Sequence, residues 1–134
     1  MTDSVTSRTH LVVVHPNEGV QDTHHGFMRQ WGITDKTTSS RMISMTHGTL
    51  APGLKAEPHY HPFETAIYII AGKARVFFGP NLEHEVICQT GDFVYIDAGV
   101  VHTPENIGET PLDYVAARAA PDDEYFLPGT GPMA

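Results

Sequence analysis

Cysteine is nearly missing from this sequence of 134 residues, which holds only Cys88. A single cysteine cannot form an internal disulfide, so the disulfide-stapled secreted domains are excluded and a reducing compartment is favoured. The simplest role for Cys88 is that of a small, buried, apolar side chain.

Basic side chains are also few. Lys and Arg number 8 against 16 Asp and Glu, which gives a formal net charge of −8 with histidine neutral. Non-specific binding to nucleic acid or to an anionic membrane requires a basic surface, so neither partner is expected. No apolar run approaches the roughly 20 residues of a membrane-spanning helix. Residues 1–7 lack the basic and apolar regions of a secretion signal. We therefore expect a cytoplasmic protein.

Turn-forming residues, in contrast, are abundant, with 12 glycines and 10 prolines. Hydrophobic residues make up 40% of the chain and charged residues 18%, which together with the length predicts one globular domain over residues 1–134. Short apolar segments lie between the turns and none keeps a 3.6-residue period, which predicts an antiparallel sandwich or barrel. The tail from about residue 121 is expected to be an irregular arm. The expected strands are residues 9–15, 27–31, 41–50, 65–71, 74–78, 85–89, 92–96, 100–103 and 111–117.

Histidine carries the clearest chemical signal. His59 and His61 are separated by one residue, so in an extended segment both side chains point to the same side. Two imidazoles placed in this way can chelate a divalent metal ion, and Glu64 just beyond them offers a further ligand. His102 follows a second glycine turn and can meet the pair across a barrel. The pair His24–His25 lies in a polar stretch and is expected to be solvated.

His59, His61 and His102 lie in two segments that resemble the motifs of the cupin superfamily, in particular its small single-domain members. The first segment, from Gly53 to Gly72, has the family's His-x-His pair but places Glu64 one residue early. The second, from Gly91 to Asn106, has the family's spacing with Asp97 in place of a proline. The resemblance implies a double-stranded β-helix, or jelly-roll barrel, with the motifs over residues 53–106. It also implies a small-molecule ligand or substrate, a homodimer that exchanges an N-terminal strand such as residues 11–14, and a structural role for Asn106.

The early glutamate leaves two metal sites open. Strict alternation from His61 turns Glu64 outward, whereas a β-bulge at Pro62 would turn it inward and bring Tyr68 into the cavity. We favour the bulge, so that Glu64 and Tyr68 become candidate catalytic residues and Glu64 also a ligand. The favoured ligand set is then His59, His61, Glu64 and His102, and the alternative is the three histidines alone, with Glu64 as a candidate general base.

The resemblance implies one divalent transition metal ion per chain, with iron preferred and manganese, nickel and zinc as alternatives. Iron with open coordination positions favours a non-haem oxygenase, which is our first hypothesis. A metal acting only as a Lewis acid favours an isomerase, lyase or decarboxylase. A barrel that binds a small ligand without catalysis is the third hypothesis, because a fold does not determine a reaction.

Overall fold

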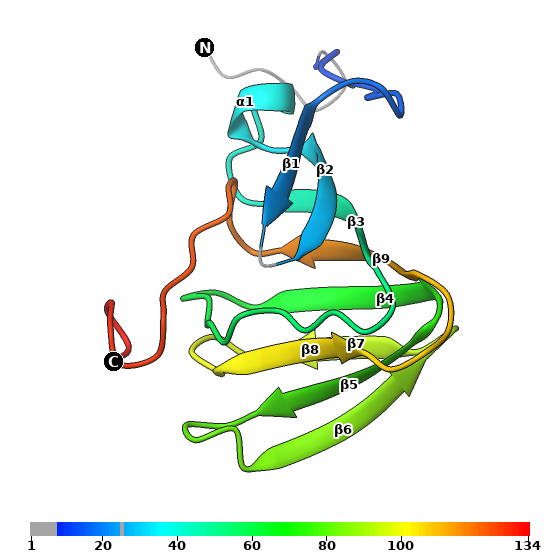
Figure 1. Cartoon of the computed structure of the whole chain (residues 1–134). Coiled ribbons are helices and arrows are strands. Elements are labelled where there is room, and N and C mark those ends of the chain that lie inside the picture. Colours follow the sequence, from blue (N-terminus) through cyan, green and yellow to red (C-terminus); the bar gives the residue numbers. More distant parts are fainter. Residues whose placement is uncertain (1–7, 25) are drawn as a thin grey trace.

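Strands dominate the computed structural model, which describes residues 8–24 and 26–134, and they form two antiparallel sheets (Figure 1). The predicted all-β barrel is therefore confirmed. The larger sheet consists, in spatial order, of β1 (Val20–His24), β2 (Phe27–Ile33), β3 (Ser44–Leu50), β9 (Leu112–Arg118), β4 (Thr65–Ala71) and β7 (Phe93–Ile96). The smaller sheet consists of β6 (His84–Gln89), β5 (Lys73–Phe78) and β8 (His102–Asn106).

The N-terminal part differs from the sequence prediction. Residues 9–15 form no strand, and Leu11 and Val13 are 83% and 67% exposed. The strand that does form, β1, has a polar sequence whose pairing with β2 at the edge of the sheet outweighs its weak strand propensity. A four-residue helix, α1 (Asp35–Thr38), was not predicted either. Thr34 caps it by accepting hydrogen bonds from the backbone N–H groups of Lys36 and Thr37.

The apolar core fills one end of the barrel. It includes Leu50, which pairs with Leu112 across β3 and β9, and Cys88, which is buried as predicted. Asn106 ties this end together, because its side-chain amide donates to the carbonyl groups of Leu50 and Thr110. The opposite ends of the same strands are therefore free of this core and open toward the segment that carries His59 and His61.

The C-terminal arm beyond β9 contains no helix or strand in the described chain, as predicted from about residue 121, yet it is firmly placed. It runs along one end of the barrel (Figure 1). Phe126 pairs with Tyr60 through the backbone and stacks on its ring at 5.6 Å. Tyr60 is 1% exposed, and its hydroxyl donates to the carbonyl of Thr130. The arm therefore covers the segment just before β4. Among the residues that the structure describes, no helix is long and apolar enough to cross a membrane.

Candidate metal centre

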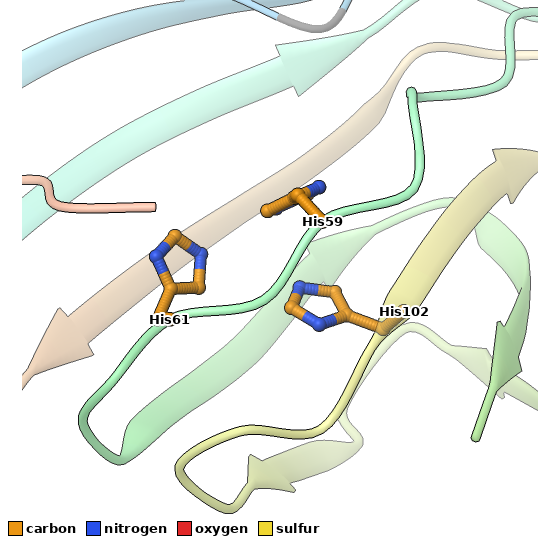
Figure 2. A group of neighbouring side chains, drawn as sticks. All are labelled: His59, His61 and His102. Carbon is orange, nitrogen blue, oxygen red and sulfur yellow. The ribbon is translucent and has the colours of Figure 1, made fainter. Parts of the chain in front are cut away.

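Three histidines converge at the open end of the barrel, and Figure 2 shows their rings around a common space. His59 and His61 come from the segment before β4, and His102 begins β8. The backbone N–H groups of His59 and His102 each donate to the other residue's carbonyl, at 3.2 and 2.9 Å. One potential ligand atom of each histidine lies within 4.8 Å of those of the other two, and all three residues are at most 7% exposed. The three histidines are therefore close enough to hold one metal ion.

The hydrogen bonds of the rings fix the same tautomer in all three. Nδ1 lies 2.8 Å from the carbonyl oxygen of Glu57 in His59, 2.9 Å from that of Glu124 in His61, and 2.9 Å from that of Val100 in His102. A carbonyl oxygen only accepts, so each Nδ1 carries a proton, and a neutral ring in this tautomer has its lone pair on Nε2. This second contact is the one that orients metal-binding histidines in proteins.

Electrostatics keep His61 in the form that binds metals. Burial lowers the pKa of His61 to about 4, although the hydrogen bond to the Glu124 carbonyl and the nearby carboxylate of Asp123 act in the opposite direction. The ring is therefore neutral at pH 7, and its lone pair is available to a cation.

The prediction that a bulge turns Glu64 inward is wrong. Glu64 is exposed, and its Oε1 accepts a 2.6 Å hydrogen bond from the hydroxyl of Tyr95, which raises the pKa of Tyr95 to about 12. Pro62 and Phe63 form a bend outside any strand, and β4 begins at Thr65, which lines the cavity, so Glu64 just before it faces outward. The structure thus brings together the three histidines and leaves Glu64 outside their cluster.

Tyr68 shares this outward orientation, so its expected place in the cavity is also wrong. It is 38% exposed, and its ring contacts Phe93 on the outer face of the large sheet at a centroid distance of 4.9 Å. The inward residues of β4 are instead Thr65, Ile67 and Ile69, all of which line the cavity.

The cavity next to the histidines has a volume of about 80 Å³. This is room for a small organic molecule, since a single water needs roughly 10–15 Å³ on the same scale. Most of its wall is apolar, as the barrel interior predicts. His24, expected to be solvated, also lines it and packs edge-on against Tyr125 at 4.4 Å. His25, the other half of that pair, lies outside the described residues.

Two arginines and an aspartate near the cavity were missed by sequence reasoning. Arg29 and Arg118 line the wall, are 8% exposed each, and stack over the ring of Trp31. Arg29 bonds Asp22 and, at 2.9 Å, Asp123 of the C-terminal arm. Burial lowers the pKa of Arg118, and the charge of Asp123 opposes this. The signal for Arg118 was its place on the inward face of a strand, four residues after Tyr114. No spacing in the sequence indicated a role for Asp123.

Comparisons with known proteins agree with this geometry. The family model described as "Cupin domain" matches residues 46–117. The oxalate decarboxylase OxdC of Bacillus subtilis (strain 168) is 35% identical over 98 residues, which cover 69% of this chain and 25% of that protein. The mannose-1-phosphate guanylyltransferase ManC of Salmonella typhimurium (strain LT2) is 29% identical over 98 residues, which cover 72% of this chain and 20% of that protein. This chain thus spans a quarter or less of the length of these relatives.

Solved structures give the same picture. An oxalate decarboxylase of Lactobacillus farciminis, in a formate complex, superposes with a TM-score of 0.73 at 25% identity, over 84% of this chain and 34% of that one. The polyketide cyclase RemF of Streptomyces resistomycificus superposes with a TM-score of 0.68 at 15% identity, over 81% of this chain and 78% of that one, a likeness of fold alone. With the family model covering more than half of the sequence and both histidine segments inside the barrel, the chain belongs to the cupin family.

Proposed function

We propose that this chain binds one divalent transition metal ion through His59, His61 and His102 and acts on a small organic molecule as a lyase or decarboxylase. The observation that carries the proposal is the shared tautomer of the three buried rings. Each Nδ1 is held by a backbone carbonyl, so in the neutral rings Nε2 carries the lone pair and is the atom that would coordinate a metal.

The donor set bears on the identity of the metal. Three imidazoles suit iron, nickel, copper and zinc, and manganese comes into question because the oxalate decarboxylase of Bacillus subtilis has Mn(II) centres. Iron, preferred from the sequence, stays one of these options. A bound metal would supply a Lewis acid that polarises a carbonyl or carboxylate oxygen.

The chain's own residues supply enclosure and orientation. The apolar part of the cavity wall disfavours water, which strengthens any electrostatic contact made inside it. The carbonyls of Glu57, Val100 and Glu124 hold the imidazole rings in place. Glu64 stays outside the cluster, so a general base there is not part of this proposal.

Elemental analysis of the purified protein tests the metal site. We expect one metal ion per chain in the wild type and in Glu64→Ala, and its loss in His59→Ala and His102→Ala. Glu64→Ala is the matched control, because it removes a carboxylate three residues from His61 whose side chain lies outside the cluster. A wild type that stays metal-free after reconstitution, or histidine variants that keep the ion, would refute the site.

A second measurement separates the candidate reactions. The metal-loaded protein is offered small carboxylic acids, and both carbon dioxide release and dioxygen consumption are followed. Release of carbon dioxide without dioxygen consumption supports the decarboxylase. Dioxygen consumption that depends on Fe(II) supports the oxygenase instead. Saturable ligand binding without turnover supports a binding barrel.

A further inference from the structure

A row of three polar residues crosses the inner wall of the barrel at the histidine end. In the large sheet, Arg118 of β9 pairs with Ser44 of β3 on one side and with Thr65 of β4 on the other. Ser44 is 0% exposed, Thr65 is 3% exposed and Arg118 is 8% exposed. Three adjacent strands thus each place a polar side chain at the same level of the barrel interior.

Each member of this row has a polar atom with no hydrogen-bond partner within residues 8–24 and 26–134. These atoms are Oγ of Ser44, Nε of Arg118 and Oγ1 of Thr65. Buried polar atoms in folded proteins nearly always have partners, so three exceptions side by side require an explanation. Arg118 does use one nitrogen, because its Nη1 donates to Oγ1 of Thr46 at 2.9 Å. The Nε side of the guanidinium has no such acceptor.

The nearest acidic group does not satisfy Arg118. Asp123 accepts from Arg29 through its Oδ2 at 2.9 Å, and its Oδ1, which has no hydrogen-bond partner among the described residues, lies 3.4 Å from Nδ1 of His61. It attracts Arg118 only through space. The guanidinium is therefore held in place by Thr46 and by the ring of Trp31, with donors left over.

Location and charge indicate what these donors are for. Arg118 and Thr65 line the same cavity as the three histidines, whereas Ser44 does not. Beside that cavity, the two positive charges of Arg29 and Arg118 balance the two negative charges of Asp22 and Asp123. A divalent cation among the histidines would add two positive charges to this balance. An anionic ligand would supply acceptors for the unpaired donors and would offset this positive charge.

We propose that Arg118 and Thr65 form the binding site for the carboxylate of a small organic acid, whose other end reaches the three histidines. The proposal rests on the proposed function for that other end. A guanidinium fork matches a carboxylate with two parallel hydrogen bonds, and the Thr65 hydroxyl adds a third donor. Substrates of the site are thus small carboxylic acids rather than neutral molecules.

The test measures the binding of acetate and of its neutral counterpart acetamide by NMR titration. The proteins are wild type, Arg118→Lys and Thr65→Val, with Arg75→Lys as the matched control. Arg75 lies on β5 on the outside of the barrel, near Glu85 and Glu105. Each protein is titrated metal-free and after loading with Co(II), whose visible absorption reports on the metal site independently.

We expect wild type and Arg75→Lys to bind acetate with the same affinity and acetamide at least about tenfold more weakly. Arg118→Lys should bind acetate about tenfold more weakly or worse, because an ammonium group does not reproduce the fork. Thr65→Val should bind acetate about threefold more weakly or worse. Because valine keeps the shape of the wall, this variant tests the site even if Arg118→Lys fails to fold.

The outcomes separate the two proposals. Normal Co(II) binding with unchanged acetate affinity in Arg118→Lys and Thr65→Val overturns the carboxylate site and leaves the metal site standing. Equal affinity for acetate and acetamide, or no acetate binding in either form of the wild type, also overturns it. Failure of Co(II) to bind overturns the proposed function, whereas acetate binding to the metal-free wild type that weakens in Arg118→Lys still supports the carboxylate site.

Discussion

Replacing Asn106 with alanine probes what holds the closed end of the barrel together. Asn106 is 1% exposed, and its side chain makes three hydrogen bonds. Its Nδ2 donates to the carbonyls of Leu50 and Thr110 at 2.8 and 2.9 Å, and its Oδ1 accepts from the N–H of Gly108 at 2.8 Å. These bonds link the end of β8 to the end of β3 and to the turn before β9.

The expected cost of Asn106→Ala follows from these contacts. Each neutral hydrogen bond contributes about 1 kcal/mol net, and a buried acceptor left without its donor costs a further 1–3 kcal/mol or so. The three bonds together with this penalty lead us to expect a fall in the free energy of unfolding of about 4–6 kcal/mol. This is a large part of the roughly 5–15 kcal/mol that a domain of this kind has in total, and it corresponds to a midpoint about 10 °C lower or more.

Urea unfolding followed by fluorescence measures this loss, because the single tryptophan, Trp31, is 5% exposed in the folded chain. The slope of the free energy of unfolding against urea concentration should be the same for wild type and variant, so that the shift in midpoint reports stability alone. Asn81→Ala is the matched control: Asn81 is exposed in the turn after β5, and its loss should cost less than about 0.5 kcal/mol. A cost below about 1 kcal/mol for Asn106→Ala would refute the reasoning.

Three further predictions concern the histidine end and the surface. In the folded chain the pKa of His61 is about 4, below its ordinary value of 6.5, so as the pH falls the unfolded chain takes up a proton on His61 before the folded chain does. Stability of the metal-free protein should therefore be full above pH 6.5 and fall by up to about 3 kcal/mol as the pH drops toward 4, and urea midpoints for His61→Gln should vary less over that window. Ultraviolet titration of the tyrosines should show the pKa of Tyr95 moving from about 12 toward its ordinary 10 in Glu64→Gln, and an unchanged titration would contradict the hydrogen bond. Light scattering should give twice the mass of one chain, because exposed apolar side chains such as Leu11 and Val13 favour a homodimer, and a monomer at micromolar concentration would argue against it.

The sequence predicted those features that depend on neighbouring residues. The alternation and the flanking turn predicted both ends of β4 correctly, and the His-x-His spacing with the distant His102 predicted the three-histidine cluster. The orientation of Glu64 could not be read in the same way. One extra residue at Pro62 would have reversed it, and the register shift of this strand turned out to lie after Ile69. A bulge is fixed by the partner strand, which a single stretch of sequence does not contain.

The polar row and the contacts of the arm were beyond prediction for a related reason. Arg118 lay one residue beyond the predicted strand 111–117, and its neighbours Ser44 and Thr65 depend on which strands flank β9. Asp123 reaches the histidines only because Tyr60 and Phe126 anchor an arm that has no regular structure. Contacts between segments far apart in the chain, made without periodic pattern, leave no local signal.

The backbone carbonyls that hold the three rings lie at different sequence separations from their histidines. Because of this difference, we expect the rings to be oriented in a definite order as the chain folds. His59 and His102 each use the carbonyl two residues before themselves, so both rings are set as soon as β8 pairs with the segment before β4. His61 uses Glu124, 63 residues away, and is set only when the arm docks. A chain cut after β9 should therefore keep two oriented imidazoles and lose the third. Undocking of the arm alone would turn a three-coordinate protein site into a two-coordinate one while the barrel stays folded.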